Sequence, residues 1–327
     1  MAPSPVTVLF TSAGRRVELL NLFRADGAAL GVPVRVLAAD THPGLSAACQ
    51  AADGHHAAPP FAVAGYVDKI LAICAREGVA LLVPLHDNEL ELFATARERF
   101  SAKGVHVAVS SPGVVRIARD KLATSRALAS AGIPVPRTGA LSDVAADATG
   151  WTWPLIAKPI VGGASIGVHV LPDAPALSVL AAQIDPARYV VQERISGAEY
   201  TVNVFVDRAG RVRCSVPHRR LEVRAGEVSK GRTERQPALA AIAPQLERAL
   251  PGAYGPLCFQ AMVTPEGGAW VFEVNARFGG GFPLAHHAGA TVPRWLLEDA
   301  LNRTCTAHDN WRSGVLMLRH DTSIFTG

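Results

Sequence analysis

The sequence FEVNARFGGG at residues 272–281 decides the fold and the chemistry expected of this chain. Side chains of a β-strand alternate between two faces, so Glu273, Asn275 and Arg277 share one face, while Phe272 and the other apolar residues face the core. The glycines that follow end the strand. A carboxylate, an amide and a guanidinium are therefore expected to project side by side from one face of the sheet.

A second strand precedes this one, and the sequence PEGG at residues 265–268 predicts the turn of a hairpin. If Thr264 faces Ala269 across the turn, Gln260 faces Glu273. Directly opposed residues have Cβ atoms roughly 4.5 to 5.5 Å apart. The hairpin therefore places an amide beside the carboxylate.

The oxygen atoms of Gln260, Glu273 and Asn275 predict a metal site. Amide and carboxylate oxygens are hard ligands that suit Mg²⁺ at about 2.0 to 2.1 Å, with Mn²⁺ as an alternative ion, and leave further positions to water and phosphates. Arg277 would then lie beside phosphate. The alternative is a strand end with solvated polar residues, because so short a motif also occurs by chance.

Composition favours a globular protein of two or three domains, because 327 residues with 49% hydrophobic content suffice for more than one core. No apolar run approaches the roughly 18 residues that span a bilayer. The N-terminus MAPSP also lacks the basic start of a signal peptide. We therefore expect a cytoplasmic protein that does not bind membranes.

The five cysteines are scattered and form no C-x-x-C pair, which predicts reduced thiols without a disulfide framework or a zinc site. The net charge of +4 comes from dispersed basic residues, and only 6% of the residues are aromatic. Both features argue against a nucleic-acid partner and favour a small anionic ligand.

The N-terminal sequence predicts the start of a parallel sheet. Residues 6–10 have the pattern of a buried strand, 15–23 that of a helix, and 34–40 that of a second strand. Gly14 stands alone where a dinucleotide-binding site would have the G-x-G-x-x-G fingerprint. The sequence therefore argues against a nicotinamide or flavin site.

A third strand at 81–85 ends at the polar sequence HDNE, at the edge of the sheet where open α/β sheets bind ligands. The polar residues at these strand ends are candidate substrate contacts: Ser12, Arg15, Asp87 and Glu89. Helix N-caps would account equally well for Ser12 and Asp87. The sequence SPG at 111–113 is expected to close this first domain.

A glycine-rich loop at 160–167 joins two predicted strands and predicts a phosphate contact. Glycines let backbone N–H groups approach an anion closely, and a nearby hydroxyl and ammonium group would add to binding. The candidate residues are Lys158, Gly162, Gly163 and Ser165, with Lys121 opening a helix at the domain junction. A plain hairpin turn is the alternative.

The stretch 218–232 is basic and punctuated by glycines, which suits a mobile loop over anionic groups. Arg219 and Lys230 are candidate contacts there, and a solvated surface loop is the alternative. Glu199, at the start of a strand, is a candidate for binding ribose hydroxyls. His286 lies next to a second histidine in a predicted helix, so it is a surface or substrate-contacting residue before it is a metal ligand.

Together these positions resemble the ATP-grasp superfamily in order and spacing. The matching residues are Lys121, Lys158 with the loop at Gly162 and Gly163, Gln192, Glu193, Glu199, Gln260, Glu273, Asn275 and Arg277. The resemblance covers about residues 115–300. The segment before it resembles the pre-ATP-grasp domain of carbamoyl-phosphate-synthase-like proteins and of the pyrrolysine-biosynthesis ligase.

The resemblance implies an α/β fold with three parts. These are a parallel-sheet N-terminal domain at 1–114, an ATP-grasp small lobe at 115–191, and a large lobe with the metal site at 192–327. It implies ATP between the two lobes, with Lys121 and Lys158 at the phosphates and Glu199 at the ribose. The residues at the adenine would be Gln192, Glu193, Arg194 and Ile195.

By the same resemblance, Gln260, Glu273 and Asn275 hold one or two Mg²⁺ ions, and Arg277 stabilises the transferred phosphoryl group. Lys230, in the basic stretch, is a further candidate catalytic residue. Gln260 departs from the many relatives that carry an acid at this position. The departure weakens the negative charge at the metal but keeps an oxygen ligand.

We therefore expect an ATP-dependent ligase that joins a small-molecule carboxylate to an amine through an acyl phosphate and releases ADP and phosphate. The alternatives are a phosphotransferase that stops at an acyl or carbamoyl phosphate, and a nucleotide-binding module without turnover. The sequence names neither substrate, and it leaves a homodimer open.

Overall fold

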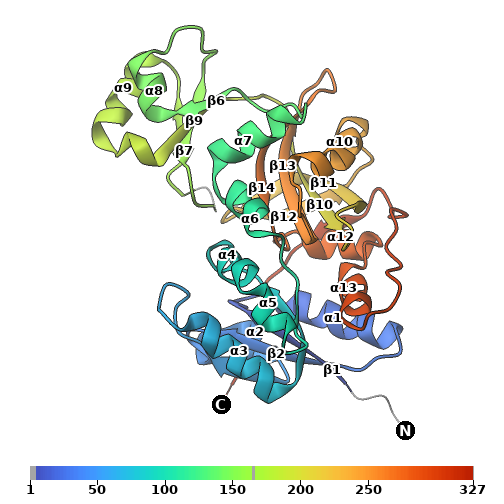
Figure 1. Ribbon diagram of the computed structural model, residues 1–327. Helices are drawn as coiled ribbons and strands as arrows, with labels where there is room; N and C mark the ends of the chain where they lie inside the picture. Colours follow the sequence, from blue (N-terminus) through green and yellow to red (C-terminus); the bar gives the residue numbers. More distant parts are fainter. Residues whose placement is uncertain (1–4, 164–165, 327) are drawn as a thin grey trace.

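Residues 5–163 and 166–326 are described by the computed structural model, and their fold is mixed α/β with three β-sheets (Figure 1). The N-terminal sheet is parallel and has the order β3-β2-β1-β4-β5. Its strands are β1 (Val6–Thr11), β2 (Val34–Asp40), β3 (Gly54–Ala57), β4 (Val79–Pro84) and β5 (His106–Val107). The helices between them are α1 (Val17–Ala29), α2 (Ala47–Ala51), α3 (Tyr66–Glu77), α4 (Asp87–Thr95) and α5 (Arg97–Ser101).

The second sheet belongs to a small lobe at the upper left of Figure 1, and it is antiparallel with the order β6-β9-β7-β8. Its strands are β6 (Thr138–Ala140), β7 (Leu155–Pro159), β8 (His169–Leu171) and β9 (Tyr189–Glu193). Helices α8 (Leu141–Ala146) and α9 (Ala174–Gln183) cover it. Two further helices, α6 (Pro112–Arg119) and α7 (Lys121–Ser130), connect this lobe to the N-terminal sheet.

The third sheet forms a large lobe and has the antiparallel order β14-β13-β10-β11-β12-β15. Its strands are β10 (Ala198–Val206), β11 (Val212–Arg224), β12 (Glu227–Thr233), β13 (Gly255–Val263), β14 (Ala269–Asn275) and β15 (Leu316–Leu318). The helices of this lobe are α10 (Pro237–Ile242), α11 (Leu246–Ala249), α12 (Phe282–Ala288) and α13 (Val292–Ala300). The expected fold class is thus confirmed, and the expected domain limits at 114 and 191 stay a prediction.

Apolar clusters join the N-terminal sheet to the large lobe. Phe10 and Phe23, from β1 and α1, pack at a ring-centre distance of 5.0 Å, and Phe23 contacts Phe278 at 6.1 Å. Trp295 of α13 belongs to the same buried cluster. The small lobe has a core of its own around Leu155. The N-terminal sheet and the large lobe therefore form one packed frame.

Helix α7 begins where the chain leaves that frame. The side chain of Asp120 is its N-cap and accepts hydrogen bonds from the backbone N–H groups of Leu122 and Ala123 at 2.8 and 2.9 Å. Asp, with Ser, Thr and Asn, is among the residues favoured for this position, because its oxygen satisfies donors that lack a partner in the first turn. The cap fixes the first helical residue, Lys121, at the junction of the sheets.

Strands β13 and β14 confirm the predicted hairpin but correct its register at the turn. Val263, and not Thr264, pairs with Ala269. A bulge farther along the hairpin shifts the register by one residue, so that Gln260 lies opposite Glu273 as expected. The prediction of this pair was right although the count that led to it was wrong.

The extra residue of this bulge is Phe272, which was expected to face the core. An extra residue interrupts the alternation of side chains along a strand. Phe272 accordingly lines a cavity, and its ring centre lies 5.2 Å from Lys158 Nζ. The expectation that it packs in the core is wrong for this reason.

The stretch 218–232 was expected to be a mobile loop, and this expectation is also wrong. It forms most of the hairpin β11–β12, in which Arg224 pairs with Glu227 across the two residues Ala225 and Gly226. Both turn residues have positive φ, at 50° and 78°, as a type I′ hairpin turn requires. The glycine therefore marks the tight turn of a hairpin.

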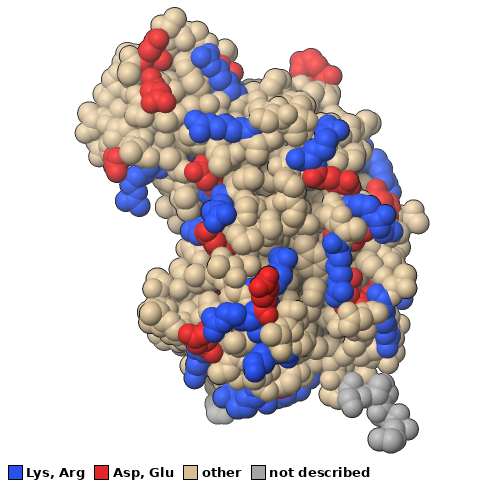
Figure 2. All heavy atoms as spheres, in the orientation of Figure 1, with Lys and Arg blue, Asp and Glu red and all other residues tan. Residues whose placement is uncertain are grey.

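Side chains of both charges are interspersed over the face shown in Figure 2. Lys and Arg lie among Asp and Glu on the N-terminal half as well as on the lobes. Within the described ranges, no helix combines the length and the apolar character needed to cross a membrane.

Candidate functional site

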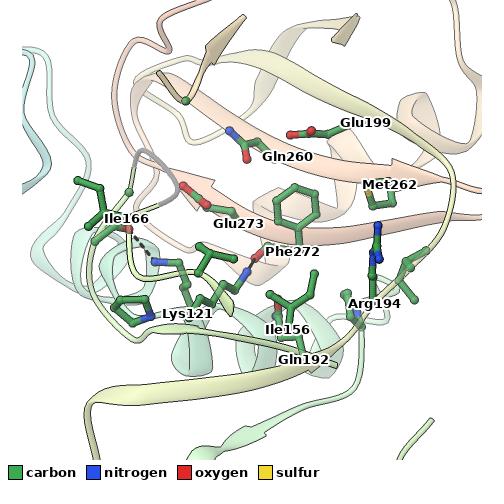
Figure 3. A pocket seen from close by; sticks show the side chains of 18 of the residues that line it. Lys121, Ile156, Ile166, Gln192, Arg194, Glu199, Gln260, Met262, Phe272 and Glu273 are labelled. Atoms are coloured by element: carbon green, nitrogen blue, oxygen red, sulfur yellow. Dashed lines mark hydrogen bonds between the residues drawn. The ribbon is translucent and has the colours of Figure 1, made fainter. Parts of the chain in front are cut away.

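A cavity of about 390 Å³ lies between the small and large lobes, and we call it the interlobe cavity (Figure 3). Strands β7 and β9 line one side, and β10, β13 and β14 line the other. It brings together most of the predicted nucleotide and metal contacts: Lys121, Lys158, Gly162, Gly163, Gln192, Glu193, Arg194, Ile195, Glu199, Gln260 and Glu273. Ser165 lies outside the described residues.

Two lysines give the interlobe cavity positive charge. Lys121 donates a hydrogen bond from Nζ to the carbonyl oxygen of Gly162 at 2.7 Å, and Lys158 donates one to the carbonyl oxygen of Phe272 at 3.4 Å. Burial lowers the pKa of both ammonium groups, and it lowers that of Lys158 to about 8 against the opposing effect of Glu273. An anion between the two lysines would favour their charged forms.

Residues 192–195, which connect the two lobes, are fixed by hydrogen bonds to residues of the small lobe. Gln192 is buried and donates from Nε2 to Thr138 Oγ1 at 2.8 Å, while Glu193 accepts the backbone N–H of Thr152 at 3.0 Å. Apolar side chains lie nearby in the same cavity: Ile156, Ile195, Met262 and Phe272. Apolar walls with a few fixed polar groups are typical of sites for flat ligands such as a purine base.

Glu199 lies on β10 and forms an ion pair with Arg220 of β11, with 2.9 Å between Oε1 and Nε. Arg220 also donates to Thr201 Oγ1 at 3.2 Å and to the carbonyl oxygen of Gly226 at 3.1 Å. Its side chain is buried and lines the interlobe cavity. Arg220 thus orients the carboxylate that was predicted to bind ribose.

The oxygen atoms expected at a metal gather on the hairpin β13–β14. Asn275 Nδ2 donates to Glu273 Oε1 at 3.1 Å, and Gln260 lies opposite Glu273 in the sheet. Figure 3 shows Gln260 and Glu273 pointing into the same cavity. In the described part of the chain, no group of three or more His, Cys, Asp or Glu side chains is placed to hold an ion. One carboxylate with two amides fits Mg²⁺ that arrives with phosphate oxygens and water as further ligands.

A second cavity of about 400 Å³ adjoins the first, and we call it the junction cavity because it lies between the N-terminal sheet and the lobes. Lys121, Gly162, Gly163 and Glu273 line both cavities. Arginines add positive charge in the junction cavity: Arg16, Arg119 and Arg277. Asn275 also lines it, so the predicted metal ligands lie at the boundary of the two spaces.

Within the junction cavity, Arg277 forms a two-point ion pair with Asp87, at 2.9 Å from Nε and 2.7 Å from Nη2. A third hydrogen bond joins its Nη1 to the carbonyl oxygen of Phe278 at 3.0 Å. Asp87 therefore holds the guanidinium and does not cap its helix, since His86 is the N-cap of α4.

Glu89 and Ser12 form a buried network at the edge of the N-terminal sheet. Glu89 accepts hydrogen bonds from Tyr66 Oη at 2.5 Å, from Ser12 Oγ at 2.9 Å and from the backbone N–H groups of Leu85 and His86. Burial raises the pKa of its carboxyl group. These contacts close the capping box of α4. They use both Glu89 oxygens inside the protein, so its geometry is that of a structural acid.

The other predicted contacts are dispersed. Arg15 is exposed and lies 3.5 Å from Glu227, and Arg219 is also exposed. Lys230 forms an exposed ion pair with Glu222 at 2.7 Å. His286 hydrogen-bonds to Asp26 at 3.0 Å, at the contact of α12 with α1. None of Arg219, Lys230 and His286 lines the interlobe or junction cavity in the described structure.

Sequence reasoning missed three arginines that line these cavities, and for two of them a neighbouring arginine was chosen instead; the third is Arg119 in the junction cavity. Arg16 lines the junction cavity and Arg220 the interlobe cavity, whereas the residues chosen from the sequence were their neighbours Arg15 and Arg219. Arg16 and Arg220 are each the second member of an Arg-Arg pair. Alternation along β11 explains the second case, because Arg219 and Arg220 project to opposite faces.

Family models match most of the chain. Residues 8–108 match the PylC-like N-terminal domain, and residues 118–281 match the ATP-grasp domain. A D-alanine–D-alanine ligase of Ectopseudomonas mendocina (strain ymp) is 41% identical over 96 residues, which cover 27% of this chain and 30% of the ligase. The match to a ligase of the same name from Anaplasma marginale (strain Florida) covers 31% of that protein. The chain thus spans about a third of the length of these curated relatives.

Solved structures share the whole architecture. The biotin carboxylase domain of Hydrogenobacter thermophilus 2-oxoglutarate carboxylase, solved with MgADP, ADP and bicarbonate, matches with a TM-score of 0.76 and 15% identity. The match covers 95% of this chain and 73% of the other. An L-amino acid ligase of Bacillus licheniformis matches with a TM-score of 0.70 and 17% identity, over 91% of this chain and 75% of the other. At these identities the likeness concerns the fold.

Proposed function

Because the chain belongs to the ATP-grasp family, we propose that it is an ATP- and Mg²⁺-dependent ligase that joins a small-molecule carboxylate to an amine and releases ADP and phosphate. The observation that carries this proposal is the boundary shared by the interlobe and junction cavities, which Lys121, Gly162, Gly163 and Glu273 line from both sides. A nucleotide with its base near residues 192–195 would extend its phosphates toward that boundary. A carboxylate in the junction cavity would meet the terminal phosphate there.

The proposed reaction has two steps. A carboxylate oxygen attacks the γ-phosphorus, the bond between that phosphorus and the bridging oxygen of ADP breaks, and an acyl phosphate forms. The amine nitrogen then attacks the acyl carbon, phosphate leaves with the oxygen that had attacked phosphorus, and the nitrogen loses a proton. No protein nucleophile is needed, so positioning and electrostatics carry the catalysis.

Side chains at the boundary have the charge that such a transfer needs. Lys121 and Lys158 would bind phosphate oxygens, and Arg277 would offset the charge on the transferring phosphoryl group. Mg²⁺ held by Glu273, with Asn275 and Gln260, would neutralise further phosphate charge. Asp87 holds Arg277 in place before any substrate binds.

The test is ADP release from Mg-ATP, measured across a matrix of carboxylates and amines with mass spectrometry of the products. We expect ADP and an amide only where both substrates are present. ADP and an acyl phosphate without need of an amine would support the phosphotransferase alternative. Binding of Mg-ATP without turnover on any pair would support the nucleotide-binding module instead.

A further inference from the structure

A third cavity of about 320 Å³ lies on the other side of Arg16, and we call it the arginine cavity. It is formed by residues 15–19 at the start of α1, the turn of the β11–β12 hairpin, Gly279 and Gly280 after β14, and residues 319–324 near the C-terminus. Segments from both ends of the chain thus meet around one space. Arg16 lines both this cavity and the junction cavity, so the two adjoin.

Three arginines converge on one carboxylate in the arginine cavity. Glu227 lies 3.5 Å from Arg15, 3.4 Å from Arg16 and 2.8 Å from Arg319. Among the described residues, only the contact with Arg319 is a hydrogen bond. One negative charge therefore faces three positive charges.

Two other acids line the arginine cavity, and neither balances this excess. Asp321 forms an ion pair with Arg224, and both of its carboxylate oxygens accept hydrogen bonds from the Arg224 guanidinium. Glu18 makes no ion pair with Arg15, Arg16 or Arg319 in the described part of the chain. The cluster around Glu227 therefore has positive charge without a matching acid.

Arg16 is the member of this cluster that most needs a partner. Its side chain is 22% exposed, against 71% for Arg15. Across residues 5–163 and 166–326, its guanidinium donates no hydrogen bond to another residue of the protein. A largely buried charge is costly unless it is paired and hydrogen-bonded. Arg16 therefore has donors to offer a ligand.

The glycines after β14 bring this cluster close to the junction cavity. A Cβ atom on Gly280 would lie 2.6 Å from Glu227 Cδ, so a larger residue here would displace the Glu227 side chain from its present position. Arg319 also donates a hydrogen bond to the carbonyl oxygen of Gly280. Gly280 follows Arg277 by three residues, so the backbone that carries the predicted catalytic arginine also forms the wall of the arginine cavity.

We propose that one of the two substrates carries an oxyanion, a carboxylate or a phosphate, besides its reacting group, and that Arg16 with Arg15 and Arg319 binds this oxyanion in the arginine cavity. The reacting group of the same molecule then lies in the junction cavity beside Arg277. Arginine suits the task because its planar fork matches the oxygens of both carboxylate and phosphate. The inference rests on the proposed ligase function and assigns a substrate class to it.

The test compares small molecules that differ only in the second charged group. The acids are butyrate, succinate and 3-phosphonopropionate, and the amines are ethylamine, alanine and 2-aminoethylphosphonate. Each is titrated against the protein loaded with Mg²⁺ and a non-hydrolysable ATP analogue, with the shift in melting temperature as readout. A shift with the anionic acids assigns the oxyanion to the acid substrate, and a shift with the anionic amines assigns it to the amine substrate.

The variant Arg16→Gln tests whether the proposed residue is responsible. Loss of a charged hydrogen-bond donor should weaken the binding of the molecules with a second, anionic group roughly tenfold or more and leave the binding of butyrate and ethylamine unchanged. The control is Arg24→Gln on the same helix, because the Arg24 guanidinium already bonds to Asn21, Ala51 and Asp53.

Two results would overturn the inference while the ligase proposal stands. One is that no molecule with a second, anionic group stabilises the wild-type protein more than butyrate or ethylamine does. The other is that Arg16→Gln binds the anionic molecules as the wild type does. Failure of the ATP analogue itself to shift the melting temperature would instead count against the proposed function.

Discussion

Arg277 and Asp87 are joined by two hydrogen bonds of 2.9 and 2.7 Å across the boundary between the large lobe and the N-terminal sheet. Arg277 follows β14, and Asp87 is the first residue of α4. The guanidinium is therefore positioned by a residue that lies 190 positions away in the sequence. Asp87 occupies one side of the planar Arg277 guanidinium. The orientation of the guanidinium toward a phosphoryl group therefore depends on this ion pair.

Asp87→Asn should lower kcat roughly a hundredfold, since an amide cannot hold the guanidinium at two points and a small displacement of a catalytic group is costly. The KM for ATP should change little. Steady-state ADP release measures both. The control is Asp68→Asn, which removes an exposed acid from the same part of the protein. A normal kcat in Asp87→Asn would mean that the pair does not position Arg277.

Arg277→Lys should lower kcat by about a hundredfold to a thousandfold, because an ammonium group is a point charge and cannot replace the planar fork. Single-turnover rates with saturating substrates report the chemical step. The protein should still fold, with some loss of thermal stability because lysine cannot form both hydrogen bonds to Asp87. Rates close to those of the wild type would assign Arg277 a structural role.

Glu273→Gln and Asn275→Ala should each lower turnover about a hundredfold or more and shift the Mg²⁺ dependence to higher concentration, since the first removes the negative charge of a ligand and the second removes an oxygen ligand. The matched control is Glu266→Gln, in the exposed turn of the same hairpin. Mg²⁺ titrations of ADP release distinguish a weakened metal site from a general loss of activity. An unchanged Mg²⁺ dependence in both variants would argue against the metal site.

The hairpin shows how far sequence reasoning reaches. The hairpin itself follows from local rules, whereas the opposition of Gln260 and Glu273 was predicted correctly only because the bulge offset a wrong count at the turn. The bulge at Phe272 does not follow from those rules, because a bulge depends on what packs beside the strand. The nearby cation of Lys158, 5.2 Å from the ring, belongs to a different lobe.

Arg15 and Arg16 show the same limit of prediction from local sequence. The sequence pattern predicted that the polar residues of 12–15 and 86–89 lie at one edge of a parallel sheet, and the structure confirms the parallel sheet there. Arg15 and Arg16 both contact Glu227 of the hairpin β11–β12, more than 200 residues away along the chain. That stretch was expected to be a loop, so its packing could not be anticipated.

Lys158 gives the nucleotide site a pH dependence. Burial lowers its pKa to about 8, below the value of about 10.4 for a free lysine. Between these values the unfolded chain binds a proton that the folded chain has lost, so this group favours folding as the pH rises through that window. Over the same window the free site loses the charge that would attract phosphate.

The affinity for Mg-ADP should therefore fall above about pH 8, by up to about tenfold per pH unit for one lost charge. Calorimetric titrations between pH 7 and pH 9.5 measure it. Lys158→Arg keeps its charge over this range, so its affinity should stay level. Equal affinities at both ends of the range in the wild type would contradict the role of Lys158 in binding phosphate.

The central claim is that the carboxylate attacks the γ-phosphorus of ATP, and the path of one oxygen atom tests it most directly. With an acid substrate labelled with ¹⁸O in its carboxylate, the account predicts label in inorganic phosphate, with ADP and an amide as the other products. The attacking oxygen leaves with phosphorus when the amine displaces phosphate. Label recovered in AMP, together with pyrophosphate, would contradict the account, because it would show attack on the α-phosphorus.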